Sequence, residues 1–157
     1  MAIDLLFALK LISVLGCSLI AGVFFAFSNF VMNALARLQP AQGIAAMQSI
    51  NITVINPLFM TAFLGTGVGC VFVAISSLLK WQQISITHTM LGSLLYLIGT
   101  IGVTLVFNVP LNEALAKVEP SSADGIKIWT DYLADWTFWN HMRTGAAFAA
   151  AAAISLA

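Results

Sequence analysis

The chain has 157 residues, of which 61% are hydrophobic and only 8% are charged, and its six basic and six acidic side chains cancel. Because a soluble domain carries about 25% charged residues, this composition excludes an ordinary soluble protein and predicts an integral membrane protein in contact with the lipid bilayer. The sequence has no basic stripe of the kind that binds nucleic acid, so we exclude a nucleic-acid partner.

The first predicted helix runs from about residue 3 to residue 35, which is longer than the roughly 20 residues that cross a bilayer core. We therefore expect its far end to project from the membrane or the helix to tilt. Lys10 can extend its amine to the nearer interface. Phe24, Phe25, Phe27 and Phe30 crowd the other end. They either line a site, for which Phe25 and Ser28 are our candidates, or fill the core and meet lipid.

Residues 37–56 form a connector with a weak amphipathic pattern. Its apolar stripe recurs at steps of three and four residues and consists of Ile44, Met47, Asn51 and Ile55. A buried asparagine must be hydrogen-bonded, so Asn51 either ties two helices together or meets a ligand. Asn56 followed by Pro57 predicts a helix N-cap and a proline at the first helical position.

The second predicted span runs from residue 57 to about residue 79. Gly65 and Gly69, four residues apart, allow close approach of another helix, either within the chain or in a homo-oligomer. Cys17 and Cys70 are expected roughly 20 Å and 14 Å from the same membrane side if their helices are antiparallel, at about 1.5 Å per residue. That difference in depth predicts no disulfide between them.

The third predicted span covers residues 85–108 and is expected to end at Pro110, whose ring obstructs the preceding turn and frees carbonyl groups near Val106. Thr104, Asn108 and Asn112 are successive i, i+4 positions and form one polar stripe. Broken backbone at membrane depth is tolerated only where protein or a polar cavity covers it. Asn108 and Asn112 therefore either line such a cavity or cap the end of a helix.

Residues 113–127 hold much of the remaining charge and are expected to form a solvated loop, and the fourth predicted span covers residues 128–157. On an ideal helix, one face of this span gathers aromatic and polar side chains within an arc of roughly 100°. They are Trp129, Tyr132, Trp136, Trp139, Asn140 and Arg143. An intramembrane arginine needs a partner, so Arg143 is either a structural clamp or a ligand contact.

His141 is the side chain near this depth that suits proton transfer, and it is either a structural histidine or a general base. On an ideal helix it points roughly 160° away from Arg143. Haem ligation by His88 and His141 is a further alternative, although the predicted layout offsets them in depth by near 10 Å. We expect no metal site, because Asp131 and Asp135 lack the Glu-x-x-His pattern of carboxylate metal centres.

Four spans joined by short connections predict an all-α fold, an integral membrane antiparallel four-helix bundle with an amphipathic connector between its first two helices. The predicted topology brings polar side chains of several segments to one end of this bundle. They are Ser28, Asn29, Asn51, Asn56, Asn108 and Asn112. So many polar groups in so apolar a chain predict a cavity at that end.

The chain resembles the anthrone oxygenase-like family of membrane proteins along nearly its whole length. Four groups of residues carry the resemblance. They are Gly22-Val-Phe-Phe-Ala-Phe-Ser28, Asn51 with Ile55-Asn-Pro-Leu-Phe-Met60, Thr104 with Asn108-Val-Pro-Leu-Asn112, and Trp129 with Trp136, Trp139-Asn-His141 and Arg143. One departure is Asn33, which stands where the family pattern has proline. The resemblance implies an oxygenase that converts a polycyclic phenol with dioxygen and without a metal or organic cofactor.

In that interpretation His141 removes a proton from the substrate, Arg143, Asn140 or Asn108 stabilises the resulting oxyanion, and Trp136 and Trp139 stack on a flat ring system. Trp129 is a further candidate on the same face. The alternatives are a non-enzymatic protein that holds a lipid, a quinone or a partner helix, a haem redox protein, and a small transporter. We expect a location in a bacterial inner membrane. The orientation stays open, because the basic residues divide two against three between the two sides.

Overall fold

Long helices without any strand make up residues 5–80 and 83–157, the part of the chain that the computed structural model describes. The first helical segment consists of α1 (Leu5–Ala26), a π-helical turn η1 (Phe27–Val31) and α2 (Met32–Leu35). It ends where the sequence predicted, and the predicted start at residue 3 lies outside the described residues. A π-helix has wider turns than an α-helix, so η1 changes the direction in which the following side chains point.

The connector forms helix α3 (Pro40–Thr53), and α4 (Pro57–Lys80) follows after a short break. The predicted cap is confirmed, because Asn56 Oδ1 accepts the Phe59 amide at 3.0 Å. Ile44 and Met47 are buried as predicted. Ile55 is exposed instead, because α3 ends before it and the helical period no longer applies there.

The third segment consists of α5 (Gln83–Leu94), the π-helical stretches η2 (Leu95–Gly102) and η3 (Thr104–Asn108), and α6 (Val109–Ala116). The prediction that Pro110 ends this helix is wrong. In a π turn the amide bonds to the fifth preceding carbonyl and the turn is wider, so the proline ring is accommodated in the first turn of α6. The predicted turn before α5 falls partly on residues 81–82, outside the described residues.

Helix α7 (Ala123–Ser155) begins five residues earlier than predicted. Ser122 caps it, because the Ser122 hydroxyl accepts the Gly125 amide at 2.9 Å. The predicted loop over 113–127 is therefore reduced to the turn between α6 and α7.

Three segments are long and apolar enough to cross a membrane, namely Leu5–Leu35, Pro57–Leu79 and Ile86–Ala116. The predicted fourth span, within α7, is not among them over the described residues. Its first half carries exposed carboxylates such as Asp131 and Asp135, which lower its hydropathy. The three segments fit a membrane environment.

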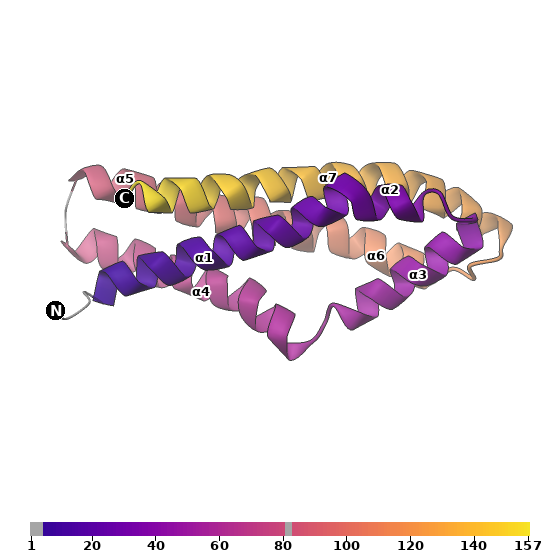
Figure 1. Ribbon diagram of the computed structural model, residues 1–157, viewed down its shortest axis with the longest axis horizontal. Helices are drawn as coiled ribbons and strands as arrows, with labels where there is room; N and C mark the ends of the chain where they lie inside the picture. The colour runs from indigo at the N-terminus through magenta and orange to yellow at the C-terminus, as the bar shows by residue number, and fades with distance from the viewer. Residues whose placement is uncertain (1–4, 81–82) are drawn as a thin grey trace.

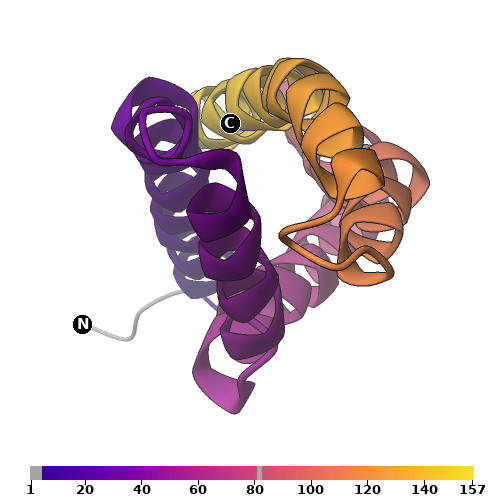
Figure 2. The same cartoon turned by 90° about the vertical axis from the view of Figure 1, so that its right-hand side faces the viewer.

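Helix α7 runs back beside α1, and the third segment packs against both α7 and α4 (Figures 1 and 2). The start of α1, the end of α4, the start of α5 and the end of α7 lie at one end of the molecule (Figure 1). Lys10 Nζ donates to the Ala157 carbonyl at 2.9 Å at this end. Small residues allow the close packing, since a Cβ on Gly99 would lie 2.6 Å from the Ala146 Cβ. Helices α3 and α4 meet in an elbow that points away from α7 (Figure 1).

The core nearer the chain ends contains both cysteines, and their predicted difference in depth is wrong. Cys17 Sγ and Cys70 Sγ are 4.0 Å apart and fully buried, and both thiols are free. Ser13 on α1 lies beside Gly69 on α4, so the two helices are aligned in a register that brings the thiols to the same level.

A second core lies toward the other end, where Trp129 and Tyr132 of α7 pack on Ile44 and Met47 of α3. Gly43 is essential to this contact, because a Cβ there would lie only 2.8 Å from Cζ2 of the Trp129 ring. The candidate site lies between the two cores.

Candidate functional site

A buried arginine on α7 forms the centre of the site. Arg143 Nε donates to Asn140 Oδ1 at 2.9 Å, and Nη1 donates to Thr104 Oγ1 at 3.1 Å. Its Cζ lies 3.9 Å from the centre of the Phe24 ring and 5.0 Å from that of Trp136. Two aromatic faces and two neutral oxygens therefore stabilise the cation.

No carboxylate pairs with Arg143 among residues 5–80 and 83–157. Its two hydrogen bonds use two of the five N–H groups of a guanidinium. A buried cation normally has an anionic partner, because the desolvation of an isolated charge is expensive. Arg143 thus offers unused donors and an uncompensated positive charge.

Asn140, one helical turn before Arg143, fixes the arginine relative to α1. Its Nδ2 donates to the Phe24 carbonyl at 2.7 Å and to Ser28 Oγ at 2.6 Å, while its Oδ1 accepts from Arg143. The side chain is fully buried. The Phe24 carbonyl is available because it belongs to the last turn of α1, just before the π-helical turn η1.

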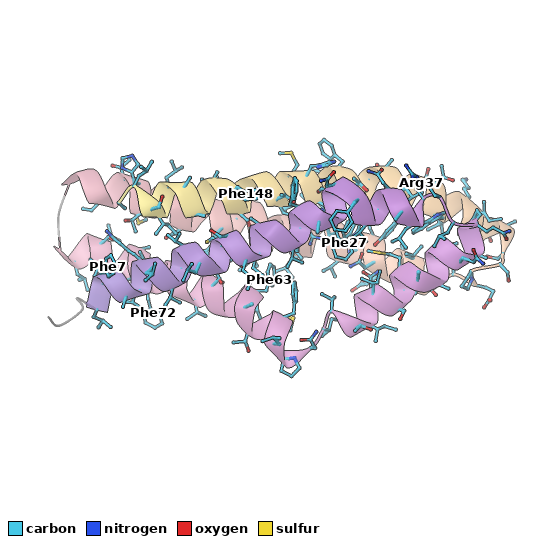
Figure 3. The ribbon with its side chains drawn as sticks, viewed as in Figure 1. Phe7, Phe27, Arg37, Phe63, Phe72 and Phe148 are labelled. Atoms are coloured by element: carbon cyan, nitrogen blue, oxygen red, sulfur yellow. The ribbon has the colours of Figure 1, made fainter. Side chains whose placement is uncertain are left out.

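An apolar cavity of about 220 Å³ adjoins Arg143. The residues that line it come from all the helical segments around it. They are Val23, Phe24, Phe27, Met47, Ile50, Asn51, Val54, Ile55, Phe59, Met60, Phe63, Thr104, Leu105, Val109, Asn112, Trp136 and Arg143. Phe63 lies between α1 and α4 near the middle of the molecule (Figure 3). A cavity is therefore present, but of the six polar residues predicted to gather around it only Asn51 and Asn112 line it, and its wall is mainly aromatic and aliphatic.

Polar groups occupy two places on the wall of this cavity. Arg143 and Thr104 form the first, and Asn51 and Asn112 form the second. The Tyr132 hydroxyl donates to Asn112 Oδ1 at 2.7 Å. Asn51 lines the cavity, so its role as a ligand contact stays a prediction.

The polar stripe of the third segment contacts the aromatic face of α7 at three levels. Thr104 contacts Arg143, Asn112 contacts Tyr132, and Asn108 Nδ2 donates to the Trp136 carbonyl at 3.1 Å. Asn108 is fully buried and does not line the cavity. Asn108 Oδ1 and Trp136 Nε1 are both buried without a hydrogen-bond partner among the described residues.

Several predicted site residues lie elsewhere. Phe25 and His141 are exposed on the opposite side of α1 and α7, in a shallow groove that Ser28 also borders. Trp139 stacks on Phe107 with ring centres 3.5 Å apart and does not reach the cavity. Trp129 is buried in the second core. Asn56 is exposed and acts as the cap of α4.

The two histidines are not brought together. Gly92 lies against Ile154, whereas Thr100 donates to the Arg143 carbonyl at 3.4 Å. His88 lies beyond Gly92 toward the chain ends, and His141 lies beyond Arg143 toward the other end, so about 15 Å or more of helix separates them. Within the described residues no group of three His, Cys, Asp or Glu side chains could hold a metal ion.

Phe24 is the site residue that the sequence interpretation missed in favour of Phe25. The buried residues of α1 and η1 include Cys17, Ala21, Phe24 and Ser28, at steps of four, three and four residues. This spacing is the signature of one helical face. Extending it from Ser28 toward the N-terminus would have selected Phe24, because Phe25 is offset by one residue and points to the exterior.

The family model described as Anthrone oxygenase matches residues 58–153, which is more than half of the chain. The matched region runs from α4 into the second half of α7 and includes Thr104, Asn112, Trp136 and Arg143. No curated protein and no solved structure is significantly similar to the chain.

Proposed function

Because the chain belongs to the anthrone oxygenase family, as its motifs predicted, we propose that it is a membrane oxygenase or oxidoreductase of a polycyclic phenolic or quinone-like molecule. We further propose that α7 completes an antiparallel four-helix bundle in the membrane around this molecule. The observation that carries the proposal is Arg143, a buried cation without a carboxylate partner among the described residues, on the wall of an apolar cavity. An anionic oxygen on a flat apolar ring system is complementary to that arrangement.

The reaction that we propose begins with an anthrone-type substrate whose ring methylene loses a proton, so that the carbonyl oxygen becomes an enolate oxygen. Arg143 binds this oxygen and stabilises the negative charge, while Phe24 and Trp136 flank the ring. The electron-rich anion passes one electron to dioxygen, and the resulting radical and superoxide combine into a peroxide. Loss of water then leaves a second carbonyl, so one dioxygen is consumed and one water is released for each quinone formed.

His141 has no part in this proposal, because it is exposed on the far side of α7 from the cavity. The polar side chains on the cavity wall are Asn51, Thr104, Asn112 and Arg143 together with the indole of Trp136, and none of these is a usual general base. The substrate anion would therefore form by proton loss to water, favoured by its binding to the guanidinium.

The same lack of a base favours a second candidate, a protein that binds a phenolic or quinone-like molecule without converting it. Both candidates place an anionic oxygen at Arg143. They differ in whether bound ligand reacts with dioxygen.

Oxygen uptake with dihydroxyanthrone, measured on the protein in lipid nanodiscs, tests the proposal. We expect uptake above that of empty nanodiscs and a fall of about 100-fold or more in Arg143→Met, the range seen when an oxyanion donor is removed. Arg37→Met is the matched control, because Arg37 is exposed near the end of α2 (Figure 3). Equal turnover in the Arg143 variant and the wild type would refute the site. Ligand binding without oxygen uptake would support the second candidate, a protein that binds the ligand without converting it.

A further inference from the structure

The cavity opens sideways through a gap that we call the mouth, defined by Ile55 of the α3–α4 elbow and Leu105 of η3. Both residues line the cavity, yet Ile55 is 72% exposed and Leu105 is 60% exposed on the outer surface. The other lining residues are buried or half-buried. A residue that lines a cavity and is also well exposed lies where the cavity meets the exterior.

With the three apolar segments across a bilayer, the mouth lies at the depth of the hydrocarbon. We take Lys10, at the end of the molecule where α1 begins and α7 ends, as one boundary of the membrane. Phe24 lies 14 residues further along α1, about 21 Å at 1.5 Å per residue. Because a bilayer core is about 30 Å thick, the Arg143 end of the cavity lies roughly 9 Å inside the opposite boundary. Leu105 follows Thr104, the partner of Arg143, and therefore has nearly the same depth.

The volume of the cavity limits the rings that it can hold. At about 220 Å³ it is roughly half as large again as an apolar cavity of about 150 Å³ that binds one benzene ring. One or two fused rings fill this space, so the third ring of an anthrone-type substrate lies at the mouth. Any further part of the ligand must leave through the mouth, where the walls are aliphatic.

Each of the two polar places on the wall offers donors to an oxygen of the ligand. Arg143 and Thr104 can hold one oxygen as an anion, and the amides of Asn51 and Asn112 can hold a second, neutral oxygen. A quinol or hydroxyquinone carries oxygens in this way. Extending the proposed function, on which this inference rests, we infer that the ligand is a lipid-dissolved quinol or hydroxyquinone with an isoprenoid or alkyl tail. Its ring head occupies the cavity and its tail passes between Ile55 and Leu105 into the bilayer.

Two ligands with the same anionic head test this inference, namely hydroxynaphthoquinone and its prenyl-substituted derivative. Binding is measured with the protein in nanodiscs, from the visible absorbance of captured ligand, and empty nanodiscs correct for partition into lipid. Because the tail lies in lipid both before and after binding, we expect the wild type to bind the two ligands with affinities within about threefold of each other.

Blocking the mouth should then weaken the binding of one ligand more than the binding of the other. We expect Ile55→Trp and Leu105→Trp to weaken binding of the prenyl derivative at least about 10-fold more than they weaken binding of the tail-less ligand. Ile52→Trp and Val106→Trp are the matched controls, because these residues are 75% and 62% exposed and do not line the cavity. Both controls should bind both ligands as the wild type does.

The ways in which this test can fail are distinguishable. If the wild type binds the tail-less ligand but excludes the prenyl derivative, or if the mouth variants weaken both ligands equally, the tail does not pass through the mouth. The inference then fails while the proposed site at Arg143 stands. If the wild type binds neither ligand, the site itself is wrong and the inference fails with it.

Discussion

Asn140→Asp changes the charge next to Arg143 with almost no change of shape. Asn140 Oδ1 accepts the Arg143 Nε–H at 2.9 Å, so an aspartate oxygen in its place forms an ion pair with the guanidinium. The adjacent cation keeps this carboxylate ionised. The variant therefore supplies the anionic partner that Arg143 lacks in the wild type, and we expect it to compete with an anionic ligand.

The geometry gives the size of the effect. A ligand oxygen bound to the free N–H groups on the other side of the guanidinium would lie on the order of 6 Å from the introduced carboxylate, across two hydrogen bonds. At an effective dielectric constant of about 20, like charges at that distance repel by roughly 3 kcal/mol. This repulsion raises the Kd of an anionic ligand about 100-fold. A neutral ligand of the same shape has no charge to be repelled.

The assay compares 2-hydroxy-1,4-naphthoquinone, a vinylogous acid that is an anion at neutral pH, with unsubstituted 1,4-naphthoquinone, which is neutral, on the same nanodisc preparations. Using both ligands on one variant separates electrostatics from damage to the fold, because Asn140→Asp also removes the Nδ2 donor to the Phe24 carbonyl and Ser28. The anion should lose about 100-fold in affinity, and the neutral ligand should lose less than about threefold. An equal loss for both ligands, or none for the anion, would refute the assignment of Arg143 as an anion-binding cation.

Three further outcomes follow from the packing. Gly43→Ala should destabilise the protein by about 1–3 kcal/mol in unfolding measurements in bicelles, because its Cβ would meet an indole ring at 2.8 Å. Gly22→Ala should leave the stability unchanged, because nothing lies within 4 Å of its Cβ. Equal stability of the Gly43 variant and the wild type would contradict the contact with Trp129. His141→Ala should change the affinity for the ligand less than about twofold, since the imidazole is outside the cavity. Loss of binding would show that His141 belongs to the site. Cys17 and Cys70 should resist maleimide in the native membrane and react in detergent unfolding, because both thiols are fully buried; rapid native labelling would show that the core opens.

The helical period of the sequence predicted which faces meet. The period places Arg143, Tyr132 and Trp136 on one face of α7. It places Thr104, Asn108 and Asn112 on one stripe of the third segment, and hydrogen bonds join the two sets. Periodicity works here because burial of a face repeats every turn, whatever the partner helix is. The same argument separated His141 from Arg143 before any contact was known.

Other features depend on information that a period does not contain. The depth of Cys17 relative to Cys70 is set by how far α1 slides along α4, and residue counts from assumed ends could not give that register. The prediction that Pro110 ends a helix failed, because only the α-helical hydrogen-bond pattern forbids proline there. The mouth at Ile55 arises from the angle between α3 and α4, which depends on packing far from the residue itself (Figure 1).

The π-helical stretches η2 and η3 have a consequence for how chain length can vary. A π turn holds one residue more than an α turn along nearly the same path. Removal of one residue within 95–108 can be absorbed when a π turn tightens into an α turn, so that residues on either side keep their faces. The same removal within α4, which is α-helical throughout, would rotate everything beyond it by about 100°. A one-residue gap in an alignment of relatives is therefore compatible with the same cavity in the third segment but not in α4.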